Sequence, residues 1–182
     1  MNPATPPQAA NPARGLHHFA WRCRDAEETR RFYEDLLGLP LVHVIRLDRV
    51  PSTGAYCPYV HIFFEMTDGS CIAFFDLGDG QAPAPSPNTP DWVAHIALRM
   101  DSLEQLVAMR DRLAAHGVEV LGPVDHGICQ SIYFFDPNGL RLEFAVPTQT
   151  AEEARAHRER ARADLDAWTA RRPPAPEPQV TA

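Results

Sequence analysis

The chain has 182 residues, of which 45% are hydrophobic and 23% charged, the composition of a globular protein with one sizeable core. Its net charge of -7 argues against nucleic acid as a partner, because phosphates call for clustered Lys and Arg. The sequence holds no apolar run long enough to span a bilayer, and its first residues lack the apolar core of a secretory signal. We therefore expect a cytoplasmic protein with neither a membrane nor a nucleic-acid partner.

Proline-rich segments divide the chain, because proline removes a backbone donor and fixes φ. They predict three segments without regular structure, namely a disordered leader over 1–14, a linker over 80–90 and a disordered tail over 173–182. The folded part between the leader and the tail is expected to consist of one domain, 15–147, and a C-terminal helix, 148–172. The linker divides that domain into two modules, over about 15–79 and 91–147.

The first module begins with a predicted strand over 15–23, followed by a helix over 25–38 that Asp25 can cap and Gly38 can end. Three further strands are predicted, over 39–47, 59–66 and 70–77.

The second module shows the same order of elements. It is expected to consist of a strand over 92–100, a helix over 102–117 and strands over 118–124, 131–136 and 140–146. The helix predicted after it carries Ala161, Leu165 and Trp168 on one stripe.

An internal repeat explains this order. LHHFAW aligns with VAHIAL, and MTDGSCIAF aligns with DPNGLRLEF, so His18 matches His95 and Ala73 matches Glu143. The repeat predicts an α+β fold of two tandem βαβββ modules. We expect two curved antiparallel sheets that form an open, metal-centred barrel around a pocket, plus the C-terminal helix.

Two short turns fix the register of the predicted hairpins. A three-residue loop with glycine in the left-handed position pairs the residues on either side of it. Applied to Thr67-Asp68-Gly69 and Pro137-Asn138-Gly139, this rule predicts three pairs: Phe63 with Ala73, His61 with Phe75, and Tyr133 with Glu143. His61 is thereby turned into the pocket.

Strand alternation directs His18, His95 and Glu143 toward one metal site, while His17 faces the other side of its strand. Two imidazoles and one carboxylate form the facial triad of non-heme Fe(II) oxygenases, although Mn(II), Zn(II) or Ni(II) would also bind. A lone histidine in a strand is more often a satisfied core residue. The symmetric placement of two histidines and an apolar setting for Glu143 favour the metal, because a buried carboxylate needs a cation or donors.

The segments LHHFAW, FYEDLLGL, WVAHIAL and HGICQSIYFFDPNGLRLEF resemble the vicinal oxygen chelate superfamily over roughly Gly15 to Pro147. This superfamily includes glyoxalases, type I extradiol ring-cleaving dioxygenases, fosfomycin-resistance transferases and bleomycin-binding proteins. In glyoxalase-like members a fourth metal ligand usually stands at the position of Ala73. Extradiol dioxygenases use three ligands, and these fall on the two histidines and the glutamate.

The resemblance to the dioxygenases implies roles for further residues. Tyr133 stands where the dioxygenases hold the hydroxyl oxygen of the substrate, and His126 fits a histidine shortly before that tyrosine. The acid/base histidine of those enzymes would fall near Ser70, so His61 is a candidate replacement, with core packing as its alternative. An apolar pocket for an aromatic ring would be lined by Phe63, Ala73 and Phe75.

The function expected from the resemblance is cleavage of a catechol-like aromatic substrate by dioxygen at one Fe(II). Two alternatives stay open. One is a metal-dependent lyase or isomerase of the glyoxalase type, and the other is a non-catalytic protein that sequesters a small aromatic molecule. Dimers are common among proteins of this kind, so a homodimer is a further expectation.

Overall fold

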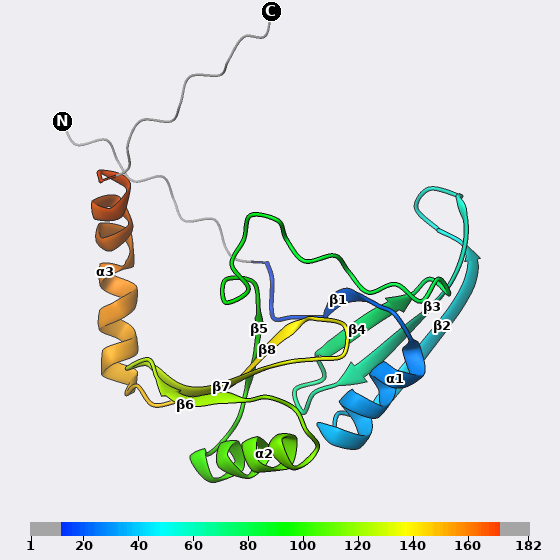
Figure 1. Ribbon diagram of the computed structural model, residues 1–182. Helices are drawn as coiled ribbons and strands as arrows, with labels where there is room; N and C mark the ends of the chain where they lie inside the picture. The colour runs from blue at the N-terminus through cyan, green and yellow to red at the C-terminus, as the bar shows by residue number, and fades with distance from the viewer. Residues whose placement is uncertain (1–11, 172–182) are drawn as a thin grey trace, which may run out of the picture.

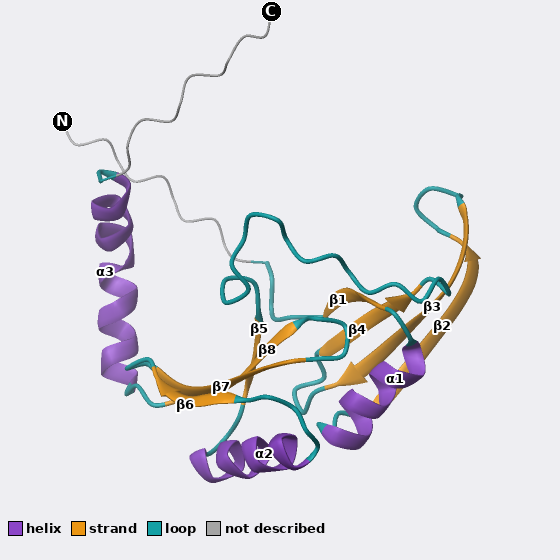
Figure 2. Cartoon of the chain, viewed as in Figure 1, coloured by secondary structure: helices purple, strands orange, loops and turns teal. Residues whose placement is uncertain are grey.

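A computed structural model describes residues 12–171 and shows an α+β fold in which helices cover two four-stranded sheets (Figures 1 and 2). Most of the predicted leader and the whole of the predicted tail lie outside the described residues. The helices α1 and α2 lie on the same side of the sheets, and α3 projects away from them (Figure 1). None of the described helices is long and apolar enough to cross a membrane.

The first module contains β1 (His18–Cys23), α1 (Ala26–Arg30), the π-helical segment η1 (Arg31–Leu36), β2 (Leu41–Arg49), β3 (Tyr56–Glu65) and β4 (Cys71–Asp76). The second contains β5 (Ile96–Arg99), α2 (Leu103–Ala115), β6 (Leu121–Asp125), β7 (Cys129–Phe135) and β8 (Arg141–Pro147). Their strand orders, β1-β4-β3-β2 and β5-β8-β7-β6, are equivalent, as the internal repeat predicts.

The sheets are mixed, and the expectation of purely antiparallel sheets was wrong. β1 pairs with β4 in parallel, and β5 pairs with β8 in parallel, while the other neighbours are antiparallel. The reason is the helix that follows the first strand of each module. It carries the chain across the sheet, as a crossover connection between parallel strands requires. The two sheets remain separate and form no closed barrel within the described residues.

The register that the two turns predict is confirmed. Phe63 pairs with Ala73 and His61 with Phe75 in the first sheet. Tyr133 pairs with Glu143 in the second. Because neighbouring residues of a strand face opposite sides, each sheet has one face packed on the helices and one face that bears the candidate site residues.

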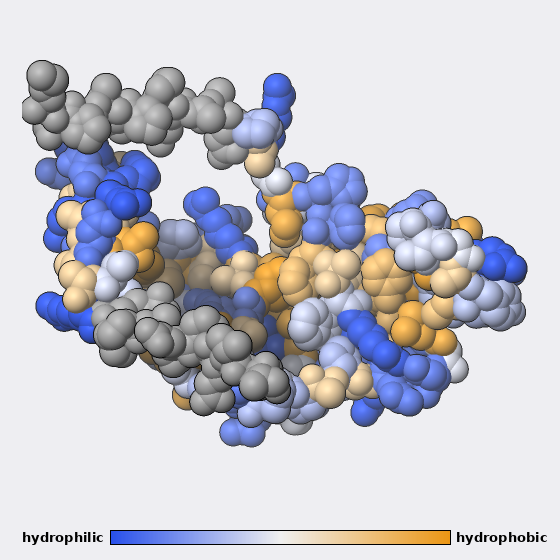
Figure 3. Space-filling model, turned by 90° about the horizontal axis from the view of Figure 1, so that it is seen from above, coloured by the Kyte–Doolittle hydropathy of each residue, from blue (hydrophilic) through white to orange (hydrophobic). Residues whose placement is uncertain are grey.

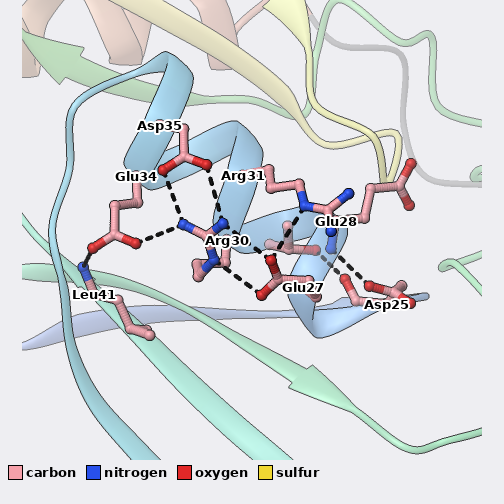
Figure 4. Close-up of polar contacts among 9 residues, drawn as sticks. Asp25, Glu27, Glu28, Arg30, Arg31, Glu34, Asp35 and Leu41 are labelled. Carbon is pink, nitrogen blue, oxygen red and sulfur yellow. Dashed lines mark hydrogen bonds and ion pairs between the residues drawn. The ribbon is translucent and has the colours of Figure 1, made fainter.

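The first helix begins at Asp25, whose side chain accepts a hydrogen bond of 2.7 Å from the backbone N–H of Glu28. Arg30 then bridges acidic residues of the preceding and following turns, Glu27, Glu34 and Asp35, at 2.8–3.0 Å (Figure 4). This network fixes the helix on its exposed side. Its apolar side faces the core.

One hydrophobic core joins the two modules. It contains residues from the helix-facing sides of both sheets, among them Phe64, Phe74, Phe134 and Leu142. The ring of Phe32 in η1 lies 6.3 Å from that of Phe134 in β7, so the helical segment of the first module packs on the second sheet.

Buried hydrogen bonds lock this contact. The Tyr33 hydroxyl donates to Asp136 at 3.0 Å, and the Asn138 amide donates to the Thr29 hydroxyl at 3.1 Å. The backbone N–H of Arg24 donates to the Asn138 side chain at 3.1 Å. The β7–β8 turn of one module is therefore tied to the first helix of the other, and the two sheets keep a fixed relative orientation.

The C-terminal helix α3 (Ala151–Thr169) lies within the range predicted for it and begins with a capping box of Thr150 and Glu153. None of its 19 residues is buried by the described part of the chain. Leu165 and Trp168 are 55% and 65% exposed. The apolar stripe of this helix is thus uncovered by residues 12–171.

Candidate functional site

The second sheet brings His95 and Glu143 together. β8 positions Glu143 on the face opposite the helices, and His95 directly precedes β5, the strand that pairs with β8. The Nε2 atom of His95 lies 2.9 Å from a carboxylate oxygen of Glu143, which is only 6% exposed. The sequence placed His95 inside a longer strand, whereas β5 begins one residue later.

Tyr133 and His126 extend this group. The Tyr133 hydroxyl and the His126 Nε2 share a hydrogen bond of 2.8 Å, and the ring of Tyr133 lies 5.9 Å from that of His95. His126 follows β6 directly, in the turn before β7. Burial and the nearby Glu143 carboxylate both raise the pKa of Tyr133, so its hydroxyl keeps its proton at neutral pH. We call His95, Glu143, Tyr133 and His126 the second-sheet cluster.

The first sheet holds the other candidate residues. The ring of His18 lies 5.9 Å from that of His61 and 5.5 Å from that of Phe63. His61 also stacks on Phe75, with ring centroids 3.6 Å apart. Ala73, which pairs with Phe63, is fully buried, so this part of the first sheet is apolar. The predicted pocket residues therefore do lie together, on one face of the first sheet.

His61 is 7% exposed, and its Nε2 atom has no hydrogen-bond partner among residues 12–171. Burial, with smaller contributions from His18 and His43, lowers its pKa to about 4. The imidazole is therefore neutral near pH 7, and its Nε2 atom is unpaired within residues 12–171 but shielded from solvent.

The orientation of the His17 side chain differs from the predicted one. It was expected to face away from His18, yet the Nδ1 atoms of the two residues are hydrogen-bonded at 2.7 Å. β1 begins at His18, so strand alternation does not extend to His17.

The three predicted metal ligands do not form one group in the single chain. Residues 12–171 contain no set of three His, Cys, Asp or Glu side chains arranged to hold a metal ion. Glu143 and His95 meet on the second sheet, whereas His18 lies on the first sheet among His61 and Phe63. The expected convergence within one chain is thus not seen among residues 12–171.

Arg141 is a site residue that the sequence reasoning missed. It shares a face of β8 with Glu143, and its guanidinium carbon lies 4.8 Å from the centroid of the Tyr133 ring. The signal was present in the predicted hairpin, since the register that pairs Tyr133 with Glu143 also places Arg141 on the same face, opposite Phe135.

Two equivalent βαβββ modules, each with a histidine near the start of its first strand, define the class of protein. The family model for the Glyoxalase/Bleomycin resistance protein/Dioxygenase superfamily matches residues 15–144. The chain belongs to this superfamily, as its resemblance to the vicinal oxygen chelate proteins predicted.

Among curated proteins, the chain is 28% identical over 144 residues to biphenyl-2,3-diol 1,2-dioxygenase 3 of Rhodococcus globerulus. The match covers 75% of this chain and 68% of that protein. It is 29% identical over 113 residues to biphenyl-2,3-diol 1,2-dioxygenase 2 of the same organism, with coverages of 56% and 59%.

Solved structures show the same fold. A glyoxalase/dioxygenase from Nostoc punctiforme is 24% identical, with a TM-score of 0.57 and coverages of 78% of this chain and 97% of that one. The FosX fosfomycin resistance protein of Listeria monocytogenes, in a complex with Mn(II), is 21% identical, with a TM-score of 0.52 and coverages of 74% and 93%. At these identities the likeness establishes the fold alone.

Proposed function

We propose that the protein is an extradiol-type dioxygenase that cleaves a catechol-like aromatic substrate with dioxygen at one Fe(II). The second-sheet cluster carries this proposal, because it combines two potential metal ligands with a hydrogen-bonded tyrosine and histidine on one open face. The likeness to biphenyl-2,3-diol dioxygenases supports the same chemistry.

The side chains of the second-sheet cluster indicate which metal would fit. A carboxylate and an imidazole within 2.9 Å of each other suit Fe(II), but one chain supplies only these two ligands as a group. We propose that a homodimer completes the site, with His18 of the partner subunit as the third ligand. The buried contact between the modules favours this solution, because it fixes the two sheets relative to each other while no third ligand lies beside His95 and Glu143 within residues 12–171.

Symmetry makes such a dimer self-consistent. In a twofold dimer any contact from the first sheet of one chain to the second sheet of the other occurs twice, so two equivalent sites form. Each would combine one second-sheet cluster with one wall of Phe63, Ala73 and Phe75. Hydrophobic residues do gather in the middle of the face that lies away from α1 and α2 (Figure 3).

Each residue then has a defined task. Fe(II), when bound, supplies the one-electron chemistry that lets dioxygen react with the ring. The protonated Tyr133 hydroxyl donates a hydrogen bond to a substrate oxygen, and His126 fixes the direction of that hydroxyl. We propose His61, which is neutral near pH 7, as the acceptor of a proton from the second substrate hydroxyl; its Nε2 atom has no partner within residues 12–171 and is shielded from solvent in the single chain. The aromatic wall stacks on the ring and excludes water.

The test is metal analysis after anaerobic purification, followed by oxygen uptake with a panel of catechols. About one iron per chain and iron-dependent uptake with a vicinal diol are expected. Tight zinc or nickel binding without oxygen uptake would instead indicate the lyase or isomerase. Binding of aromatic compounds by a metal-free protein would indicate the sequestering protein.

A further inference from the structure

Arg141 is a cation built into the wall of the second-sheet cluster. Its side chain is 12% exposed, and its guanidinium carbon lies 4.8 Å from the ring centroid of Tyr133 and 5.9 Å from that of Phe135. Both rings belong to β7, directly across from β8. The cation therefore lies over the tyrosine that the proposed function assigns to the substrate.

The charge of Arg141 is poorly compensated. Its Nε atom is inaccessible to solvent and has no hydrogen-bond partner within residues 12–171. The carboxylate that approaches it is Asp91, at 4.0 Å from Nη1, and the Asp91 side chain is 74% exposed. Contact at this distance with an exposed carboxylate is weak. Glu143, on the same face, is engaged with His95.

A largely buried cation whose Nε–H has no partner within residues 12–171 is costly unless an anion joins it. The planar guanidinium offers donors in a fork that matches a carboxylate better than any neutral group. Arg141 and Glu143 are two residues apart on one strand, which separates their Cα atoms by about 7 Å. This is close to the span of a single benzene ring with its substituents.

We propose that Arg141 binds a carboxylate on the substrate, which makes the substrate a ring that carries a vicinal diol at one end and an acidic group at the other. This inference rests on the proposed function for the diol end. Arg141 would then be a specificity-determining residue that orients the ring, with the diol toward Tyr133 and Glu143.

The test compares equilibrium binding of 3,4-dihydroxybenzoate and 4-methylcatechol to the full-length protein under argon, where no turnover occurs. The two probes differ chiefly in that one carries a carboxylate where the other carries a methyl group. The wild type is expected to prefer the acid, and Arg141→Gln is expected to lower that preference by about tenfold to hundredfold, the effect of one charged hydrogen-bonded contact. Arg141→Lys keeps the charge without the fork and is expected to lie between them.

Arg49→Gln is the matched control, because Arg49 also lies over a tyrosine, at 5.7 Å from the centroid of Tyr56, but on the exposed β2–β3 hairpin. It is expected to keep the wild-type preference. If Arg141→Gln weakens both probes equally, Arg141 only supports Tyr133 and the inference is overturned. The same holds if the wild type shows no preference or binds neither probe.

Failure of the proposed function has a different signature. If the protein prefers the acid through Arg141 but consumes no oxygen, the anion site stands and the dioxygenase proposal is rejected. If oxygen uptake is equal for both probes and unchanged in Arg141→Gln, the dioxygenase proposal stands and the anion site is rejected.

Discussion

The Tyr33 hydroxyl donates a hydrogen bond to Asp136, 3.0 Å away, and so joins the first helical segment to the β7–β8 turn of the other module. Both residues are buried, and burial raises the pKa of the Asp136 carboxyl. The bond therefore compensates a polar pair at the centre of the contact between the modules.

Replacing Tyr33 by Phe is expected to lower the free energy of unfolding by about 1–3 kcal/mol, because Asp136 loses a buried donor. Urea denaturation measures the change. Tyr56→Phe is the control, since Tyr56 is 70% exposed and should show no effect. Equal stability of the Tyr33→Phe variant and the wild type would show that the contact does not depend on this bond.

A mixed dimer tests where the metal site forms. His18→Ala and Glu143→Ala should each abolish iron binding on their own. In a twofold dimer whose sites are shared, random mixing of the two variants restores one intact site in each heterodimer, or roughly a quarter of the wild-type sites. Iron content per chain measures this recovery. A mixture that binds no more iron than its components would place all ligands within one chain, and the shared site would be rejected.

Tyr133 and His126 are expected to act as one unit, because their side chains are hydrogen-bonded at 2.8 Å. Tyr133→Phe and His126→Gln should each lower kcat for a catechol by about a hundredfold. The double variant should be no slower than the worse of the two, since either change breaks the same contact. His116→Gln, at the exposed end of α2, serves as the control. Additive losses would show that the two residues act separately.

Alkaline pH should destabilise the protein through Cys23. This thiol is fully buried, and burial raises its pKa to about 11. The unfolded chain loses the thiol proton near its ordinary pKa of about 8.5, whereas the folded chain holds it. The free energy of unfolding therefore falls as pH rises from about 9 to 11, with a slope of up to about 1.4 kcal/mol per pH unit.

Cys23→Ala removes this proton and should flatten the slope between pH 9 and 11 relative to the wild type. Denaturation midpoints across that range measure it. Cys57→Ala, at a half-buried position on the first sheet, should keep the wild-type slope. Identical slopes for all three proteins would assign the alkaline loss to other groups, such as the buried Tyr33, whose pKa is also raised.

The strand pairing within each module was predictable from sequence. The turns at Gly69 and Gly139 determine the hairpin register, and that register alone turns His61, Tyr133 and Glu143 onto the site faces. The internal repeat predicted the two modules and their equivalent strand orders. These features depend on neighbours in the chain, which is why pattern and spacing suffice for them.

The arrangement of the two modules was not predictable in the same way. The repeat makes His18 and His95 equivalent, but equivalence does not say whether their sheet faces meet within one chain. That depends on the packing of Phe32 on Phe134 and on the bond from Tyr33 to Asp136, which join residues about a hundred positions apart. No local pattern in the sequence encodes such a contact.

The exposed helix α3 has a consequence for how stability is measured. Its 19 residues contribute helical dichroism, but none of them is buried against the rest of the described chain, so little couples their melting to that of the core. Most helical stability in proteins comes from tertiary packing, which α3 largely lacks within residues 12–171. As long as α3 remains uncovered, we expect it to melt separately from the sheets, so that unfolding departs from a two-state process. A midpoint taken from the helical signal would fall below that of the sheets.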